Sequence, residues 1–66
     1  NILFLPLFKL APVFKQIIKP NSFLILSGLL KQQIPYIINR YNNFGFIKEK
    51  KIISEEWGSV IMTIKS

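Results

Sequence analysis

The sequence predicts an α/β fold in which a helix, a strand, a second helix and an antiparallel pair of strands follow one another. Two observations support this prediction. The four apolar residues Phe23 to Leu26 lie between a Pro-Asn turn and Ser27-Gly28, a pattern typical of a short strand that is buried on both faces. On each side, apolar residues recur every three or four positions over about the length of a helix. We therefore take residues 23–26 as the core of a central strand.

The first helix is predicted over residues 3–18. Its apolar side chains recur at helical spacing and its lysines fall largely elsewhere, which is typical of a helix that packs on a protein core. A helix on a membrane surface is the alternative. Pro12 must either begin the regular part of the helix or kink it, because proline lacks a backbone N–H and clashes with the carbonyl four residues back. After the helix, Pro20 presets a turn in which Asn21 tolerates a positive φ.

The strand after this turn is expected to run from Ser22 or Phe23 to about Ser27. Ligands of open α/β sheets gather outside the carboxyl ends of strands, so Ser27 and Gly28 could touch a ligand. We favour the alternative in which Ser27 forms a turn or caps the next helix.

The second helix is predicted over residues 31–43. Pro35 is tolerated near its first turn, and Gly45 is placed to end it in a left-handed conformation. Arg40 is expected to face solvent. Core packing explains the two tyrosines of this helix better than stacking on nucleic-acid bases. The apolar stripe that faces the core comprises Ile34, Ile37, Ile38, Tyr41 and Phe44.

Two strands are predicted at the end of the sequence, over residues 46–53 and 57–65. The first carries charged residues from Lys48 to Lys51, which suits a sheet edge because lysines discourage further pairing. The second is more apolar and should lie further inside the sheet, antiparallel to the first. Two helices can cover one face of such a sheet. A strand that is apolar on both faces therefore implies a second cover that these residues do not supply.

The composition narrows the possible chemistry. A net charge of +6 favours anionic partners such as RNA, ribosomes or membrane surfaces, although most lysines are scattered as single solvated positions. The absence of cysteine and histidine excludes disulfides, the usual zinc ligand sets and nucleophilic catalysis with a histidine base. The sequence shows no secretory signal and no uninterrupted apolar run near the roughly 18 residues that span a bilayer. We therefore expect a soluble, cytoplasmic chain without a metal site, which could also be a piece of a longer protein.

Several short motifs occur together in the order and spacing of one protein family. They are Asn-Ile-Leu at residues 1–3, Leu-Ala-Pro at 10–12, Leu-Ser-Gly at 26–28 and Glu-Trp at 56–57. On these motifs the sequence resembles the PrmA family, the ribosomal protein L-eleven methyltransferases, over essentially its whole length. The resemblance implies the C-terminal portion of a doubly wound, Rossmann-like class I methyltransferase domain. The chain would be a fragment of this single domain, without the N-terminal half that carries the cofactor loop.

The resemblance implies a protein N-methyltransferase that transfers methyl from S-adenosyl-L-methionine to lysine and terminal amines of a large-subunit ribosomal protein. It also implies a cytoplasmic enzyme, expected to be a monomer without membrane or direct nucleic-acid contacts, whose last strand is inserted beside the strand at residues 23–26. The isolated chain is expected to be inactive because the cofactor loop would be missing. Two alternatives stay open: a methyltransferase of the same fold with another amine substrate, and a small basic module that binds RNA or a membrane surface.

Asn1 is the position that matches a functional residue of the family. The resemblance implies that Asn1 lies between the cofactor S-adenosyl-L-methionine and the incoming amine, where its side-chain carbonyl accepts an amine hydrogen bond and orients the lone pair toward the methyl group. Ile2 and Leu3 would line the substrate side of the same pocket. This role is positioning, so no residue is predicted to act as a general acid, base or nucleophile. Phe4-Leu5 stands where smaller residues are expected and could narrow this pocket.

Overall fold

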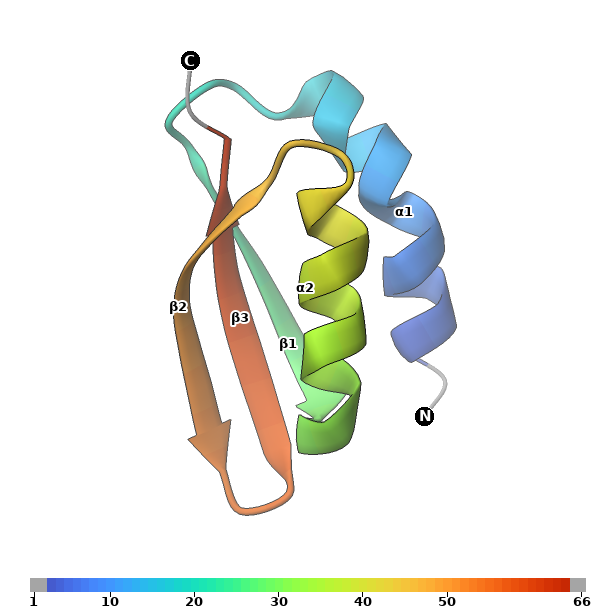
Figure 1. The fold of residues 1–66 in the computed structure, drawn as a ribbon, viewed down its shortest axis with the longest axis vertical. Coiled ribbons are helices and arrows are strands. Elements are labelled where there is room, and N and C mark those ends of the chain that lie inside the picture. The colour runs from blue at the N-terminus through green and yellow to red at the C-terminus, as the bar shows by residue number, and fades with distance from the viewer. Residues whose placement is uncertain (1–2, 65–66) are drawn as a thin grey trace.

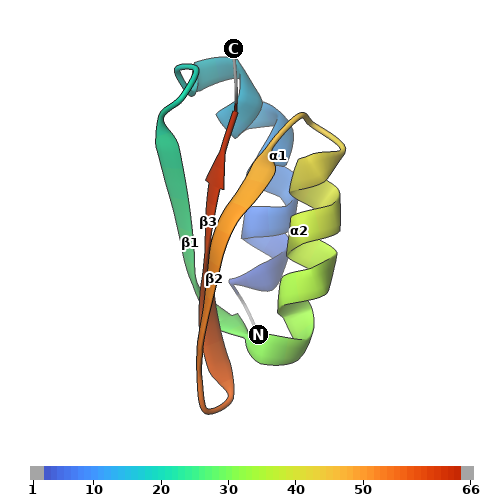
Figure 2. The same cartoon turned by 60° about the vertical axis from the view of Figure 1, so that its left-hand side comes forward.

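The computed structural model describes residues 3–64 and shows two helices packed on one face of a three-stranded antiparallel sheet (Figure 1). No described element covers the opposite face of the sheet (Figure 2). The predicted α/β fold and its order of elements are confirmed. The elements are α1 (Phe4–Ile17), β1 (Phe23–Leu30), the 3₁₀ turn η1 (Lys31–Gln33), α2 (Ile34–Asn42), β2 (Ile47–Ser54) and β3 (Trp57–Thr63).

The last strand of the chain, β3, lies between β1 and β2 and is antiparallel to both. Its position beside β1, which the family resemblance implied, is therefore confirmed. β2 is an edge strand with all of its residues exposed, as its lysines predict. β1, which we expected to be central, is the other edge of the described sheet. Its prediction as a central strand is wrong for residues 3–64, because β3 is its one partner there.

β1 is buried on one face only. Leu26 and Leu29 are 2% and 0% exposed beneath the helices, whereas Phe23 and Ile25 are 65% and 64% exposed on the other side. Residues 3–64 supply no second cover, as the sequence predicted, so burial of the other face of β1 stays a prediction. We call the two sides the covered face (Leu24, Leu26, Leu29, Gly58, Val60, Met62) and the open face (Phe23, Ile25, Ser27, Trp57, Ser59, Ile61).

The C-terminal end of β1 also differs from the prediction. The strand does not end at Ser27 but continues to Leu30, because a β-bulge keeps the chain in the sheet at this point. The hydroxyl of Ser27 lies on the open face, where it accepts a hydrogen bond from Ser59 Oγ at 3.1 Å. Ser27 therefore neither ends the strand nor caps a helix, and the alternative that we favoured is wrong.

The helix boundaries follow the proline and glycine signals in part. α1 begins well before Pro12, so Pro12 lies inside the helix and does not begin it. Pro35 lies in the first turn of α2, where its missing N–H costs no helical hydrogen bond. Gly45 has a φ of 91° and Asn21 a φ of 66°, so both predicted left-handed positions are confirmed.

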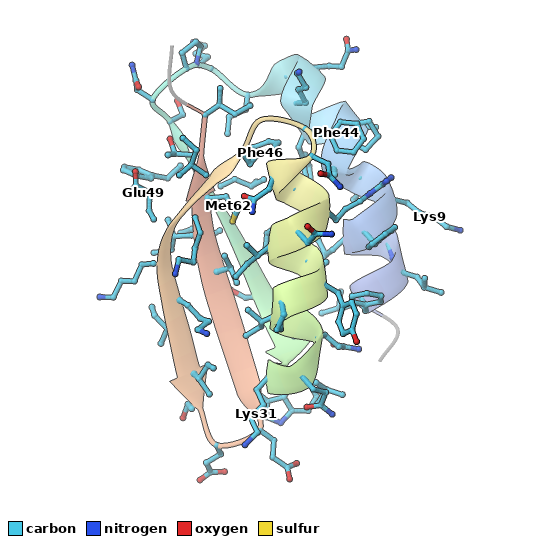
Figure 3. The ribbon with its side chains drawn as sticks, viewed as in Figure 1. Lys9, Lys31, Phe44, Phe46, Glu49 and Met62 are labelled. Carbon is cyan, nitrogen blue, oxygen red and sulfur yellow. The ribbon has the colours of Figure 1, made fainter. Side chains whose placement is uncertain are left out.

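The core lies between the helices and the covered face. Figure 3 shows Phe46 and Met62 between α2 and the sheet, and both side chains are buried. Phe46 precedes β2 instead of beginning it, because its N–H donates to the carbonyl of Tyr41 at 3.1 Å and not to a strand. Its ring packs edge-on against that of Tyr41 at 5.3 Å between centroids. The predicted core packing of the tyrosines is confirmed for Tyr41 and wrong for Tyr36, which is 67% exposed.

Candidate functional site

The predicted site residues fall at the start of α1. Asn1 and Ile2 lie outside the described residues, so their roles stay predictions. Leu3 directly precedes α1, and its carbonyl accepts a hydrogen bond from the N–H of Leu7 at 3.1 Å. The side chain of Leu3 is 44% exposed, so part of it is available to a ligand.

Leu3 lies against the bulge of β1. A Cβ atom added at Gly28 would be 2.6 Å from Leu3 Cδ1, so the leucine side chain rests on the glycine backbone. The strand register shifts between Leu26 and Leu29, and Gly28 has a φ of 75° within this shift. The N-terminal end of α1 and the C-terminal end of β1 lie at the same end of the molecule (Figures 1 and 2). The structure thus brings together Leu3 and Gly28, which sequence analysis considered separately.

Arg40 connects the two helices, contrary to our expectation that it faces solvent. Its Nε donates a hydrogen bond to the carbonyl of Phe8 at 3.0 Å. Its Cζ lies 4.4 Å from the ring centroid of Phe8 and 4.9 Å from that of Phe44. The Phe8 carbonyl has no helical donor four residues on, because Pro12 has no N–H. Arg40 supplies the donor that Pro12 lacks.

Tyr41 makes a second bond between the helices. Its hydroxyl donates to the carbonyl of Leu7 at 2.6 Å, and its side chain is buried. Burial raises the pKa of Tyr41 to about 12, and the positive charge of Arg40 partly opposes this rise. α1 is therefore fixed to α2 at two successive carbonyls. These bonds position the helix that directly follows the Asn-Ile-Leu segment.

Sequence reasoning missed Arg40 as a part of this region, and it missed the contact of Gly28 with Leu3. A signal for Arg40 was present, because a proline inside a helix leaves one carbonyl that must be satisfied from elsewhere, and Arg40 is the single arginine of the chain. The signal for Gly28 was weaker. A glycine within a strand pattern indicates a bulge or a close approach, but it does not indicate which side chain approaches.

The three charged side chains that Figure 3 labels do not converge on one point. Lys9, Lys31 and Glu49 extend from different sides of the molecule (Figure 3). Residues 3–64 contain no pocket and no cluster of three or more His, Cys, Asp or Glu side chains that could hold a metal ion. Neither helix of this range is long and apolar enough to cross a membrane. The junction of Leu3 and Gly28 is therefore the candidate site, because it adjoins the predicted site residues.

Comparison with known proteins finds matches of the chain to one family. A profile of the family described as ribosomal protein L11 methyltransferase (PrmA) matches residues 1–65. The ribosomal protein L11 methyltransferase of Nitrosococcus oceani is 42% identical over 57 residues, which cover 86% of this chain and 19% of that protein. The protein of the same name from Hydrogenovibrio crunogenus is 43% identical over 63 residues, which cover 96% of this chain and 21% of that protein. In Brucella abortus such a protein is 35% identical over 63 residues, which cover 96% of this chain and 22% of that protein.

The chain thus spans about a fifth of the length of the curated relatives that it matches. No solved structure gives a significant match.

Proposed function

Because this chain belongs to the ribosomal protein L11 methyltransferase (PrmA) family, we propose that it forms the C-terminal portion of a protein N-methyltransferase. The enzyme transfers methyl from S-adenosyl-L-methionine to lysine and terminal amines of that ribosomal protein in the cytoplasm, as a monomer. The match over residues 1–65 is the observation that carries this proposal. It favours this function over the two alternatives, since the relatives described above share one name.

We further propose that the sheet continues into the doubly wound sheet of a class I methyltransferase domain. Two observations support this extension. The open face exposes Phe23, Ile25 and Trp57 by 65%, 64% and 52%, and a second layer of helices is the usual cover for such a surface. β1 carries no charged residue, whereas the other edge strand, β2, carries several lysines. The free edge of β1 is therefore suited to pair with a further strand.

S-adenosyl-L-methionine supplies the methyl group as an electrophilic sulfonium when it is bound. Residues 3–64 do not fit this cofactor by themselves, because they enclose no pocket. Their glycines, at positions 28, 45 and 58, also stand too far apart for a glycine-rich cofactor loop. The proposal therefore assigns this loop to another part of the enzyme.

The contribution of this chain to catalysis is proposed to be the positioning of the substrate amine. The amide oxygen of Asn1 accepts a hydrogen bond from the amine and so orients the nitrogen lone pair, while Asn1 also contacts the cofactor. Ile2 and Leu3 line the substrate side. The partial exposure of Leu3, whose side chain is 44% exposed, supports a contact with substrate.

A chimeric enzyme tests the proposed function. Residues 1–65 of this chain replace the matched segment of the Hydrogenovibrio crunogenus protein, and transfer of a labelled methyl group to purified ribosomal protein L11 is measured. We expect transfer, and we expect Asn1→Ala to lower kcat by about 10²-fold because the amine loses its orientation. Lys9→Ala is the control, since Lys9 is exposed on α1 and should leave kcat unchanged. A folded chimera that binds the cofactor but transfers no methyl would contradict the proposal.

The 66-residue chain alone provides a second test. We expect calorimetry to detect no binding of S-adenosyl-L-methionine, because the cofactor loop lies elsewhere. Measurable affinity would show that the loop has been assigned to the wrong part of the enzyme.

A further inference from the structure

We propose that Gly28 is a positioning residue for methyl transfer, because its backbone forms the seat on which Leu3 rests and so sets the position of a side chain that is proposed to line the substrate side. The role in methyl transfer rests on the proposed function. The seat itself rests on the geometry of Leu3 and Gly28.

The first observation is the backbone of the seat. Gly28 has a φ of 75°, a conformation that glycine adopts readily and residues with a Cβ atom adopt rarely. It lies between Leu26 and Leu29, where the register with β3 shifts. Such bulges redirect the chain locally. The pairing resumes at Leu29 and Gly58, so the bulge is held by ladder hydrogen bonds on both sides.

The second observation is the contact. A Cβ atom at position 28 would lie 2.6 Å from Leu3 Cδ1. Nonbonded carbon atoms are best separated by about 3.5–4.0 Å, so any side chain at position 28 would displace the leucine methyl by about 1 Å. Leu3 Cδ1 is the end of a side chain that is 44% exposed, so the leucine can move without unfolding the core. A substitution at position 28 therefore changes mainly the position of the Leu3 side chain.

The third observation concerns where this displacement goes. α1 begins at Phe4, directly after Leu3. The helix is held at the Leu7 carbonyl by Tyr41 and at the Phe8 carbonyl by Arg40. Because α1 is held, the displacement falls on the side chain of Leu3, which ends in the colliding methyl group. Leu3 is the described residue that is proposed to line the substrate side, so its displacement changes the position of the substrate amine.

Gly45 provides a matched control for the backbone conformation. Its φ is 91°, so an alanine there is also placed in the left-handed region. A Cβ atom at position 45 would have nothing within 4 Å. Gly45→Ala therefore reproduces the backbone cost of Gly28→Ala without a collision. The difference between the two variants isolates the contact with Leu3.

The activity experiment is a double-mutant cycle in the chimera described above. We expect Gly28→Ala to lower kcat by about 10- to 100-fold with a KM for S-adenosyl-L-methionine within about threefold of the unmodified chimera, since a misplacement of about 1 Å can cost 10²-fold. Gly45→Ala should leave kcat unchanged. In a Leu3→Ala background the additional effect of Gly28→Ala should disappear, because the colliding methyl group is gone. Equal losses for Gly28→Ala and Gly45→Ala, or an unchanged effect of Gly28→Ala after Leu3→Ala, would overturn the proposal.

A structural readout separates this inference from the proposed function. In a leucine-methyl-labelled sample of the 66-residue chain, we expect a nuclear Overhauser contact between a δ-methyl of Leu3 and the α-protons of Gly28. Absence of this contact in the folded chain would overturn the seat. If the contact is present but a folded, cofactor-binding chimera transfers no methyl, the proposed function fails and the role of Gly28 in it is overturned, while the seat stands.

Discussion

The two faces of the sheet have similar apolar side chains, but the helices of residues 3–64 cover only one of them. On the covered face, Leu26, Leu29 and Val60 are 2%, 0% and 0% exposed beneath the helices. On the open face, Phe23 and Ile25 are 65% and 64% exposed (Figure 2). Both faces carry large apolar side chains, so side-chain chemistry alone does not explain which face is buried. What decides burial in residues 3–64 is the position of α1 and α2.

The open face is more apolar than an ordinary solvent-facing side of an antiparallel sheet. In such sheets apolar side chains alternate with polar ones along each strand. On the open face of β1, Ser27 is polar, but Phe23 and Ile25 are apolar. An apolar face of this kind is typical of a strand that lies between two layers. The comparison therefore supports the proposed second layer and can be tested by substitution.

The largest expected effect is on the covered face. Leu26→Ala should lower the free energy of unfolding of the 66-residue chain by about 2–5 kcal/mol, because it leaves a cavity in the core. The matched control is Ile25→Ala, its neighbour on the open face, which should cost less than about 1 kcal/mol because most of the side chain is already exposed. Urea unfolding measures both values. Similar losses for the two variants would contradict the distinction between the faces.

The same open-face substitution should behave differently in the chimera. If a second layer covers the open face there, Ile25→Ala removes a buried side chain and should cost about 2–5 kcal/mol. Thermal or urea unfolding of the chimera provides the measurement, with Ile25→Val as a smaller truncation at the same position. A cost in the chimera no larger than in the isolated chain would mean that this face stays uncovered.

An intermediate effect is expected where α2 holds α1. Arg40→Met should cost about 1–3 kcal/mol, because the Phe8 carbonyl loses its donor. Pro12→Ala restores a backbone N–H four residues beyond Phe8, so Arg40→Met should cost less in that background. The four unfolding free energies of this double-mutant cycle give the coupling. Zero coupling would mean that Arg40 acts through its ring contacts alone.

A smaller effect is expected for the neighbouring tyrosine. Tyr41→Phe removes the hydrogen bond to Leu7 and should cost about 1 kcal/mol at pH 7. The pKa of Tyr41 is raised to about 12, so the folded state favours the neutral phenol.

The contribution of the neutral Tyr41 phenol to the free energy of unfolding is complete below the pKa of an unfolded tyrosine, about 10. It is lost as the pH rises from there toward 12. The stability difference between the original chain and Tyr41→Phe should therefore shrink over this range. A difference that stays constant up to pH 12 would contradict the raised pKa.

The smallest effect is expected for the polar pair on the open face. Ser27→Ala removes an exposed hydrogen bond to Ser59 and should change the free energy of unfolding by less than about 0.5 kcal/mol. Ser59→Ala removes the other partner and should give the same result. A loss above about 1 kcal/mol in the isolated chain would indicate that this pair is shielded from water.

Local sequence signals predicted most of the elements and several single positions. Pro20-Asn21 and Gly45 mark the ends of the helices, and Asn21 and Gly45 have the expected positive φ. The lysines of β2 predicted an edge strand. These predictions succeed because they depend on the steric preferences of one or two residues or on the charge of one strand.

Three features could not be predicted from local sequence signals, because each depends on residues that are distant in the sequence. The continuation of β1 through Gly28 depends on its pairing with β3, which outweighs the turn signal of Ser27-Gly28. The inward position of Arg40 depends on a carbonyl of α1 that Pro12 leaves without a donor.

The contact of Leu3 with Gly28 depends on the packing of α1 beside the end of β1. The sequence by itself therefore determined the order of the elements, the left-handed positions Asn21 and Gly45, and the family. Only the tertiary structure decided which carbonyl each polar side chain meets and which face of the sheet is covered, because these depend on contacts between elements.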